Sequence, residues 1–104
     1  MVTKTVSLSN PIYEILQQTA GNSDINGALS KILKDFFQLK IHALKEKISV
    51  YETKYGMSFA KFEETCRNSD IKDPYTYGIE KDTWDWEASI TEMEDLLELE
   101  QWLS

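Results

Sequence analysis

Apolar residues recur at helical spacing along one long stretch of the chain, from Ile25 to Tyr55. No glycine or proline interrupts this stretch after Gly27, so the pattern predicts one helix, about 46 Å long at 1.5 Å per residue. From Phe37 onward the apolar positions alternate steps of four and three, the spacing of a coiled-coil seam. A small domain cannot cover such a rod, so we expect another chain to cover part of it.

Polar and apolar residues alternate strictly between Thr3 and Leu8, which predicts a short strand with Val6 and Leu8 on one face. The sequence offers this strand no second strand to pair with. Its backbone groups would therefore pair with the same strand of a second chain, or the segment would fray.

A short helix is predicted between Ser9 and Gly21. Pro11 suits a first helical turn, and Gly21 tolerates the left-handed backbone angles that end a helix. Ser23, Asp24 or Asn26 would then cap the long helix. The predicted order is strand, short helix, tight turn and long helix.

Beyond the long helix, Gly56 predicts a stop and Ser58 caps a short helix. Asp73-Pro74 and Gly78 mark a linker before a last, acidic helix. The predicted fold class is mainly α, divided into residues 1–56, 57–67, 68–82 and 83–104.

Residues 5–16, Thr-Val-Ser-Leu-Ser-Asn-Pro-Ile-Tyr-Glu-Ile-Leu, resemble the start of ribbon-helix-helix repressors, a family common among prokaryotic antitoxins. The resemblance implies a homodimer or higher oligomer whose paired strands enter the DNA major groove. It places Thr3, Thr5 and Ser7 against bases and Asn26 near a phosphate. The alternative is a dimerisation module with weak or no DNA contact. The residues expected to form the dimer are Val6, Leu8, Leu29, Leu33, Phe37, Ile41, Leu44 and Ile48.

Two later segments, residues 54–63 (Lys-Tyr-Gly-Met-Ser-Phe-Ala-Lys-Phe-Glu) and 79–88 (Ile-Glu-Lys-Asp-Thr-Trp-Asp-Trp-Glu-Ala), are similar to the tail of small antitoxins encoded beside TumE-family toxins. This resemblance implies that the chain belongs to a toxin-antitoxin pair. The implied partner is a basic protein toxin that handles RNA.

Charge is divided unevenly along the chain, whose net charge is −7. Residues 1–67 hold nine Lys and Arg against seven Asp and Glu, whereas residues 68–104 hold two Lys against eleven Asp and Glu. The two parts should prefer different partners, and a basic protein surface is the natural complement of the acidic tail.

The acidic tail also carries the aromatic residues Tyr75, Tyr77, Trp84, Trp86 and Trp102, a type of residue that often anchors interfaces. For Trp86, an intramolecular core against Tyr51, Tyr55, Phe59 and Phe62 is an equal alternative. Residues two apart lie on different helix faces, so Trp84 and Trp86 should not both point inward. The residues expected to bind the partner are Tyr75, Tyr77, Glu80, Asp82, Trp84, Asp85, Trp86, Glu87, Ile90 and Leu97.

No combination of residues suggests an enzyme, a cofactor or a metal site. Carboxylate pairs occur without a basic or nucleophilic partner, and general acid–base catalysis needs groups with opposed roles. The chain holds one cysteine, Cys66, and one histidine, His42, too few for a Cys/His metal cluster. Cys66 lies on an apolar stripe, which favours packing as a small hydrophobic residue. His42 lies beside the seam, which favours the surface or the rim of an interface.

Taken together, these patterns predict an antitoxin that neutralises a basic toxin through its C-terminal segment and represses its own operon through its N-terminal ribbon. The alternative is a homo-oligomeric helical protein whose tail packs back on the coiled coil, with no toxin or DNA partner. The apolar stretches are short and no secretory leader opens the chain, so we expect a cytoplasmic protein without membrane contact.

Overall fold

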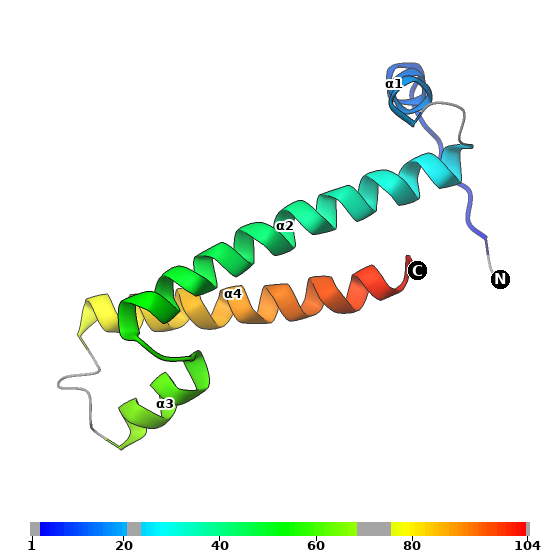
Figure 1. Ribbon diagram of the computed structural model, residues 1–104. Helices are drawn as coiled ribbons and strands as arrows, with labels where there is room; N and C mark the ends of the chain where they lie inside the picture. The colour runs from blue at the N-terminus through cyan, green and yellow to red at the C-terminus, as the bar shows by residue number, and fades with distance from the viewer. Residues whose placement is uncertain (1–2, 21–23, 69–75, 104) are drawn as a thin grey trace. The chain divides into compact units, whose positions relative to one another are not determined.

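Four α-helices make up most of the chain in the computed structural model, which describes residues 3–20, 24–68 and 76–103 (Figure 1). They are α1 (Asn10–Ala20), α2 (Ile25–Tyr55), α3 (Phe59–Arg67) and α4 (Tyr77–Gln101). The mainly helical class is therefore confirmed. The chain divides into two units, Met1–Phe36 and Phe37–Ser104.

The first unit contains α1 and the start of α2, and it buries little apolar surface. Leu16 on α1 and Ala28 on α2 are buried. The large apolar side chains that stay exposed in this unit are Val6, Ile12, Tyr13, Ile15, Ile32, Leu33 and Phe36.

Residues 3–9 adopt no strand in the described part of this single chain. The predicted strand requires a second chain to satisfy its backbone groups, so the ribbon stays a prediction. The side chains of Thr3, Thr5 and Ser7 are exposed.

Helix α2 has the predicted bounds, and Asp24 is its cap. A carboxylate oxygen of Asp24 accepts a hydrogen bond from the Gly27 N–H at 2.6 Å, and its carbonyl accepts one from the Ala28 N–H at 2.8 Å. A negative charge at this position also suits the positive end of the helix. The same carboxylate occupies the N-terminal turn where Asn26 was expected to meet a DNA phosphate.

Gly56 ends α2 as predicted, with a positive φ of 69° that favours glycine over residues with a Cβ. Ser58 then caps α3: its hydroxyl oxygen accepts a hydrogen bond from the Lys61 N–H at 3.3 Å. This sharp reversal lets α3 begin beside the end of α2. Phe62 on α3 is completely buried.

Helix α4 begins at Tyr77, so the prediction of a linker over 68–82 was wrong for residues 77–82. Gly78 was interpreted as a helix breaker. It lies in the first turn of α4, where backbone N–H groups have no acceptor within the helix whatever the residue, so glycine is tolerated there. Residues 69–75 of the predicted linker, which include Tyr75, lie outside the described residues.

Helices α2 and α4 lie side by side and run antiparallel in the second unit (Figure 1). Gln38 hydrogen-bonds to Glu100 near one end, and Lys54 contacts Asp82 near the other. Ile41 and Leu44 of the predicted seam are buried in this unit. Along residues 37–55 the helix that lies beside α2 is thus α4 of the same chain. That another chain covers part of the long helix stays a prediction.

Candidate protein-interaction surface on helix α4

The face of α4 that meets α2 carries carboxylates opposite a row of lysines. Lys40, Lys47 and Lys54 follow one another at intervals of seven residues, so they lie along one side of α2. The three ion pairs of this row are Lys40–Glu92 at 3.3 Å, Lys47–Asp85 at 2.6 Å and Lys54–Asp82 at 2.5 Å. The lysines of α2 therefore neutralise part of the acidic tail within the chain.

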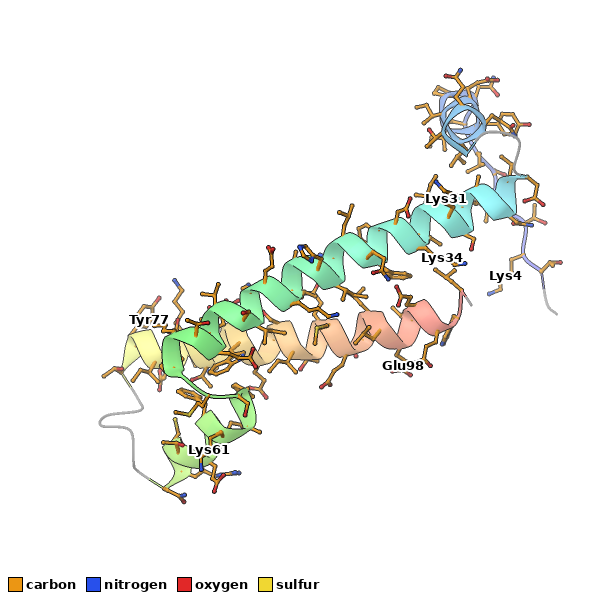
Figure 2. All side chains as sticks on the ribbon, in the orientation of Figure 1. Lys4, Lys31, Lys34, Lys61, Tyr77 and Glu98 are labelled. Carbon is orange, nitrogen blue, oxygen red and sulfur yellow. The ribbon has the colours of Figure 1, made fainter. Side chains whose placement is uncertain are left out.

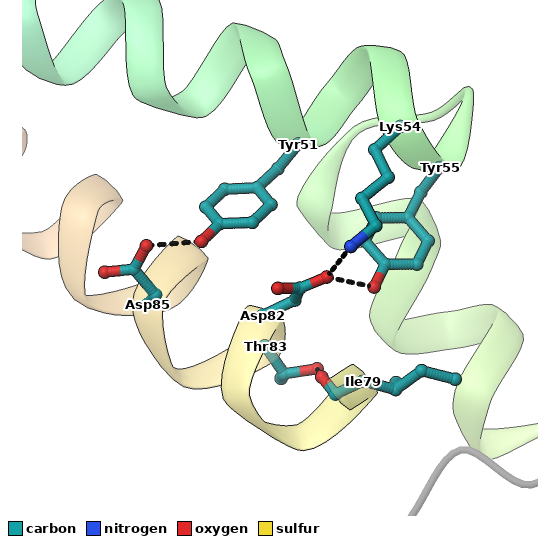
Figure 3. A network of polar contacts seen from close by, with 7 residues as sticks. All are labelled: Tyr51, Lys54, Tyr55, Ile79, Asp82, Thr83 and Asp85. Atoms are coloured by element: carbon teal, nitrogen blue, oxygen red, sulfur yellow. Dashed lines mark hydrogen bonds and ion pairs between the residues drawn. The ribbon is translucent and has the colours of Figure 1, made fainter. Parts of the chain in front are cut away.

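Two tyrosines of α2 add hydrogen bonds to the same carboxylates (Figure 3). The Tyr51 hydroxyl donates to Asp85, and the Tyr55 hydroxyl donates to the same Asp82 oxygen that Lys54 contacts, at 2.6 Å. Asp82 and Asp85 thus each have one cationic and one phenolic partner. The Thr83 hydroxyl donates to the Ile79 carbonyl within α4, at 2.7 Å.

These contacts shift the pKa values of all four groups. The hydrogen bond to Asp85, followed by burial, raises the pKa of Tyr51 to about 12. Burial, followed by the hydrogen bond to Asp82, raises the pKa of Tyr55 further. Burial acts to raise the pKa of Asp82, but hydrogen bonds from Lys54 and Tyr55 outweigh it and lower the pKa. Hydrogen bonds from Lys47 and Tyr51 lower the pKa of Asp85.

Trp86 is the centre of the core of this unit. Its side chain is 0% exposed, and its ring lies 5.1–5.8 Å from the rings of Tyr51, Tyr55, Phe59 and Phe62. These are the four residues named in the core alternative, so that alternative is the one found here. The indole N–H of Trp86 is buried and has no hydrogen-bond acceptor among the described residues.

The opposite face of α4 exposes the other aromatic residues. Tyr77, Trp84 and Trp102 are 77%, 64% and 80% exposed. They belong to one line along the helix; from Trp84 to Trp102 its positions are spaced four or three residues apart, and each of these is exposed. We call this line the outer row; it consists of Tyr77, Trp84, Ala88, Thr91, Asp95, Glu98 and Trp102.

Negative charge accompanies the exposed aromatic residues. Helix α4 contains nine Asp and Glu residues and one Lys. The side chains of Glu87, Asp95 and Glu98 form no ion pair or hydrogen bond with the described residues. Figure 2 shows Glu98 on the side of α4 turned away from α2. Asp95, Glu98, Leu99 and Trp102 line an open surface depression.

The structure thus separates the residues expected to bind a partner into two groups. Asp82, Asp85 and Trp86 contact α2 of their own chain, and Glu80 and Ile90 are partly buried. Those left exposed are Tyr77, Trp84, Glu87 and Leu97.

The residues expected to form the dimer also separate. Ile41 and Leu44 are buried within one chain, and Ile48, Leu8, Leu29 and Phe37 are partly buried. Val6 and Leu33 remain exposed. Among the residues expected to bind DNA, Asn26 is exposed, as are Thr3, Thr5 and Ser7.

Two features were missed from the sequence. The seven-residue repeat of lysines in α2 is visible in the sequence. The partners of these lysines can be assigned only once the neighbouring helix is known. Trp102 was noted as aromatic without being placed in a site. Its position 18 residues after Trp84, about five helical turns, was the signal that both lie on one face.

Comparisons of the chain with models of protein families, with characterised proteins and with solved structures found no match. In the described parts of the chain, no helix is both long enough and apolar enough to cross a membrane. No cluster of three or more His, Cys, Asp or Glu side chains suited to a metal ion occurs in residues 3–20, 24–68 and 76–103.

Proposed function

We propose that this chain is an antitoxin-like protein that binds and neutralises a basic protein through the outer row of α4. The observation that carries the proposal is the exposure of Tyr77, Trp84 and Trp102 on an acidic helix whose other face is already occupied. Exposed aromatic residues of this size commonly anchor protein interfaces.

The unpaired carboxylates indicate the sign of the partner. Glu87, Asp95 and Glu98 would face a cationic surface, which steers association and discriminates against acidic proteins. An RNA-handling toxin presents such a surface to phosphates. Inhibition would follow from occlusion of that surface and from mimicry of the phosphate charge. That the partner is a toxin rests on the resemblance of residues 54–63 and 79–88 to antitoxin tails.

The N-terminal unit supplies the second part of the proposal. Exposed Ile12, Ile15 and Leu33 would be covered in a homodimer, because a cluster of apolar side chains of this size is costly to leave in water. The dimer would pair residues 3–8 into a ribbon that places Thr3, Thr5 and Ser7 in operator DNA. Such binding would repress the operon and weaken steeply with added salt.

The dimer is tested by replacing Ile12 and Ile15 with glutamate. The double variant should raise the dimer Kd, measured by sedimentation equilibrium, at least about tenfold. The reason is that two apolar side chains at the interface would be replaced by charges that dimerisation buries. Leu39→Glu, on an exposed site of α2 in the other unit, is the matched control. A variant that dimerises like the parent would contradict the assignment of this face.

The toxin partner is tested by co-expression with the product of the adjacent gene. A basic protein should co-purify with the chain, and the chain should restore growth to cells that express that protein. Trp84→Ala with Trp102→Ala should abolish both effects, whereas Leu39→Ala with Val50→Ala on the exposed side of α2 should preserve them. Neutralisation unaffected by loss of both tryptophans would exclude the outer row.

A second candidate is a homo-oligomeric helical protein without a toxin. It is favoured by the contacts of Asp82, Asp85 and Trp86, through which part of the acidic tail has its complement in α2 of the same chain. For this candidate, no basic protein should be retained under the co-expression test, and the purified chain should be monodisperse by itself.

A further inference from the structure

The outer row offers only side chains to a partner, because every backbone group in the middle of α4 is hydrogen-bonded within the helix. An extended segment laid along it would leave its own N–H and C=O groups without partners in the interface. A helix satisfies those groups internally. The backbone of α4 therefore favours a helical partner over a strand.

The spacing of the outer row leads to the same conclusion. From Trp84 to Trp102 the positions advance by four, three, four, three and four residues, as the seam of α2 does where it meets α4. A partner helix can follow such a line for about five turns, or about 27 Å. Ala88 and Thr91 are small, so the two helix axes can approach closely in the middle of the row.

The chemistry of the row changes along its length. Exposed Trp84 and Trp102 bound the stretch of regular spacing, and Asp95 and Glu98 lie between them, nearer to Trp102. Burying those carboxylates is favourable only if cations meet them, because an unpaired charge loses its hydration. The matching helix has apolar residues at its ends, and Lys or Arg opposite Asp95 and Glu98.

We propose that the outer row of α4 is a docking site for a cationic amphipathic helix of about 18 residues. This inference rests on the function proposed above and specifies the part of the partner that enters the site. Two helices would then flank α4: α2 of its own chain on the inner face, and the partner's helix on the outer face.

The test uses synthetic peptides and the full chain. One peptide of about 20 residues carries Leu near its two ends and Lys between them, all on one helical face; a second has the same composition in scrambled order. Binding is measured by calorimetry at about 0.15 M salt, and the helicity of the peptide by circular dichroism. The amphipathic peptide should bind and gain helix on binding, and the scrambled peptide should bind at least about tenfold more weakly.

Two double variants locate the site. Asp95→Lys with Glu98→Lys should weaken binding of the amphipathic peptide at least about tenfold. Glu52→Lys with Glu63→Lys, at exposed positions on α2 and α3, changes the net charge equally and should change Kd less than about twofold. An equal loss of affinity in both double variants, or equal binding of the two peptides, would show that the peptide is attracted by net charge alone. Either result would overturn the inference.

The same experiment separates this inference from the proposed function. If the co-expressed basic protein is retained through Trp84 and Trp102 but the amphipathic peptide neither binds nor displaces it, the helical form of the partner is wrong and the function stands. If neither the protein nor the peptide binds, both proposals fail.

Discussion

The two faces of α4 contain the same kinds of residue in different surroundings. Trp86, Asp82 and Asp85 on the inner face meet aromatic, phenolic and cationic groups of α2 and α3. Trp84 and Asp95 on the outer face remain exposed. An acidic, tryptophan-containing helix is therefore not an interface by composition alone. What distinguishes the faces is which of them already has a complement within the chain.

Removal of a tryptophan side chain tests this difference most strongly. Trp86→Ala should lower the free energy of unfolding by about 3–5 kcal/mol, since it leaves a cavity among four aromatic rings. Trp84→Ala should change it by no more than about 0.5 kcal/mol, because that side chain is mostly exposed. Urea denaturation followed by circular dichroism measures both.

Trp86→Phe sharpens the same comparison. Phenylalanine keeps most of the ring contacts and removes an indole N–H that is buried without an acceptor. The loss of stability should therefore be clearly smaller than for Trp86→Ala. Equal losses for the two variants would mean that ring packing is not what holds α4 on α2.

A carboxylate on each face provides the next comparison. Asp82→Asn should cost about 1.5–3 kcal/mol, because it removes the charge from the contacts with Lys54 and Tyr55. Glu98→Gln on the outer face should be neutral or slightly stabilising, since it reduces repulsion among exposed carboxylates. If both changes are equally harmless, the polar contacts of the inner face add little to the hydrophobic core.

Acidification is expected to change stability in opposite directions through the two faces of α4. The pKa values of Asp82 and Asp85 are lower in the folded chain than their ordinary value of 3.8, so their contribution to stability is complete above that value and is lost as the pH falls below it through the lower folded pKa. Tyr51, with a pKa raised to about 12, contributes fully below about pH 10 and loses that contribution between pH 10 and 12. Urea midpoints should therefore fall on both sides.

Two variants assign these losses to the inner face. Asp85→Asn should flatten the acid side of the profile, and Tyr51→Phe the alkaline side. Protonation of the exposed outer carboxylates relieves repulsion and acts in the opposite direction. A midpoint that rises on acidification below pH 4 would show that this relief exceeds the contribution of the inner contacts.

The sequence predicted the long helix well because its boundaries depend on local rules. Asp24 caps it, Gly56 stops it, and between them no residue after Gly27 opposes helix formation. The start of α4 depends on more than local rules. Gly78 would weaken a helix interior, but it falls in the first turn, and Asp82 one turn later gains contacts with Lys54 and Tyr55 of α2.

The candidate site was predictable only in part, for the same reason. Heptad spacing from Phe37 to Tyr55 indicates that a helix must cover the seam, but it does not specify the chain that supplies it. The division of charge has the same ambiguity: an acidic tail needs a basic surface, which here is partly α2 itself. The two-residue spacing of Trp84 and Trp86 did predict that only one of them would be buried.

The smallest expected effect concerns two ion pairs that differ in exposure. In the pair Lys40–Glu92, both side chains are nearly half exposed, at 46% and 49%. In the pair Lys54–Asp82, the Asp82 side chain is 15% exposed. Water and salt screen the first pair more completely, so its coupling energy should be about 0–0.5 kcal/mol and should vanish at about 0.5 M salt.

Double-mutant cycles with Lys40→Met and Glu92→Gln, and with Lys54→Met and Asp82→Asn, measure the two coupling energies at low and high salt. The Lys54–Asp82 coupling should be larger and should persist in salt, because Tyr55 donates to the same carboxylate oxygen and both contacts lie beside the aromatic core. Equal couplings with equal salt dependence would show that the ion pairs of the inner face act as surface charges. Trp86 and its neighbouring rings alone would then separate the inner face of α4 from the outer one.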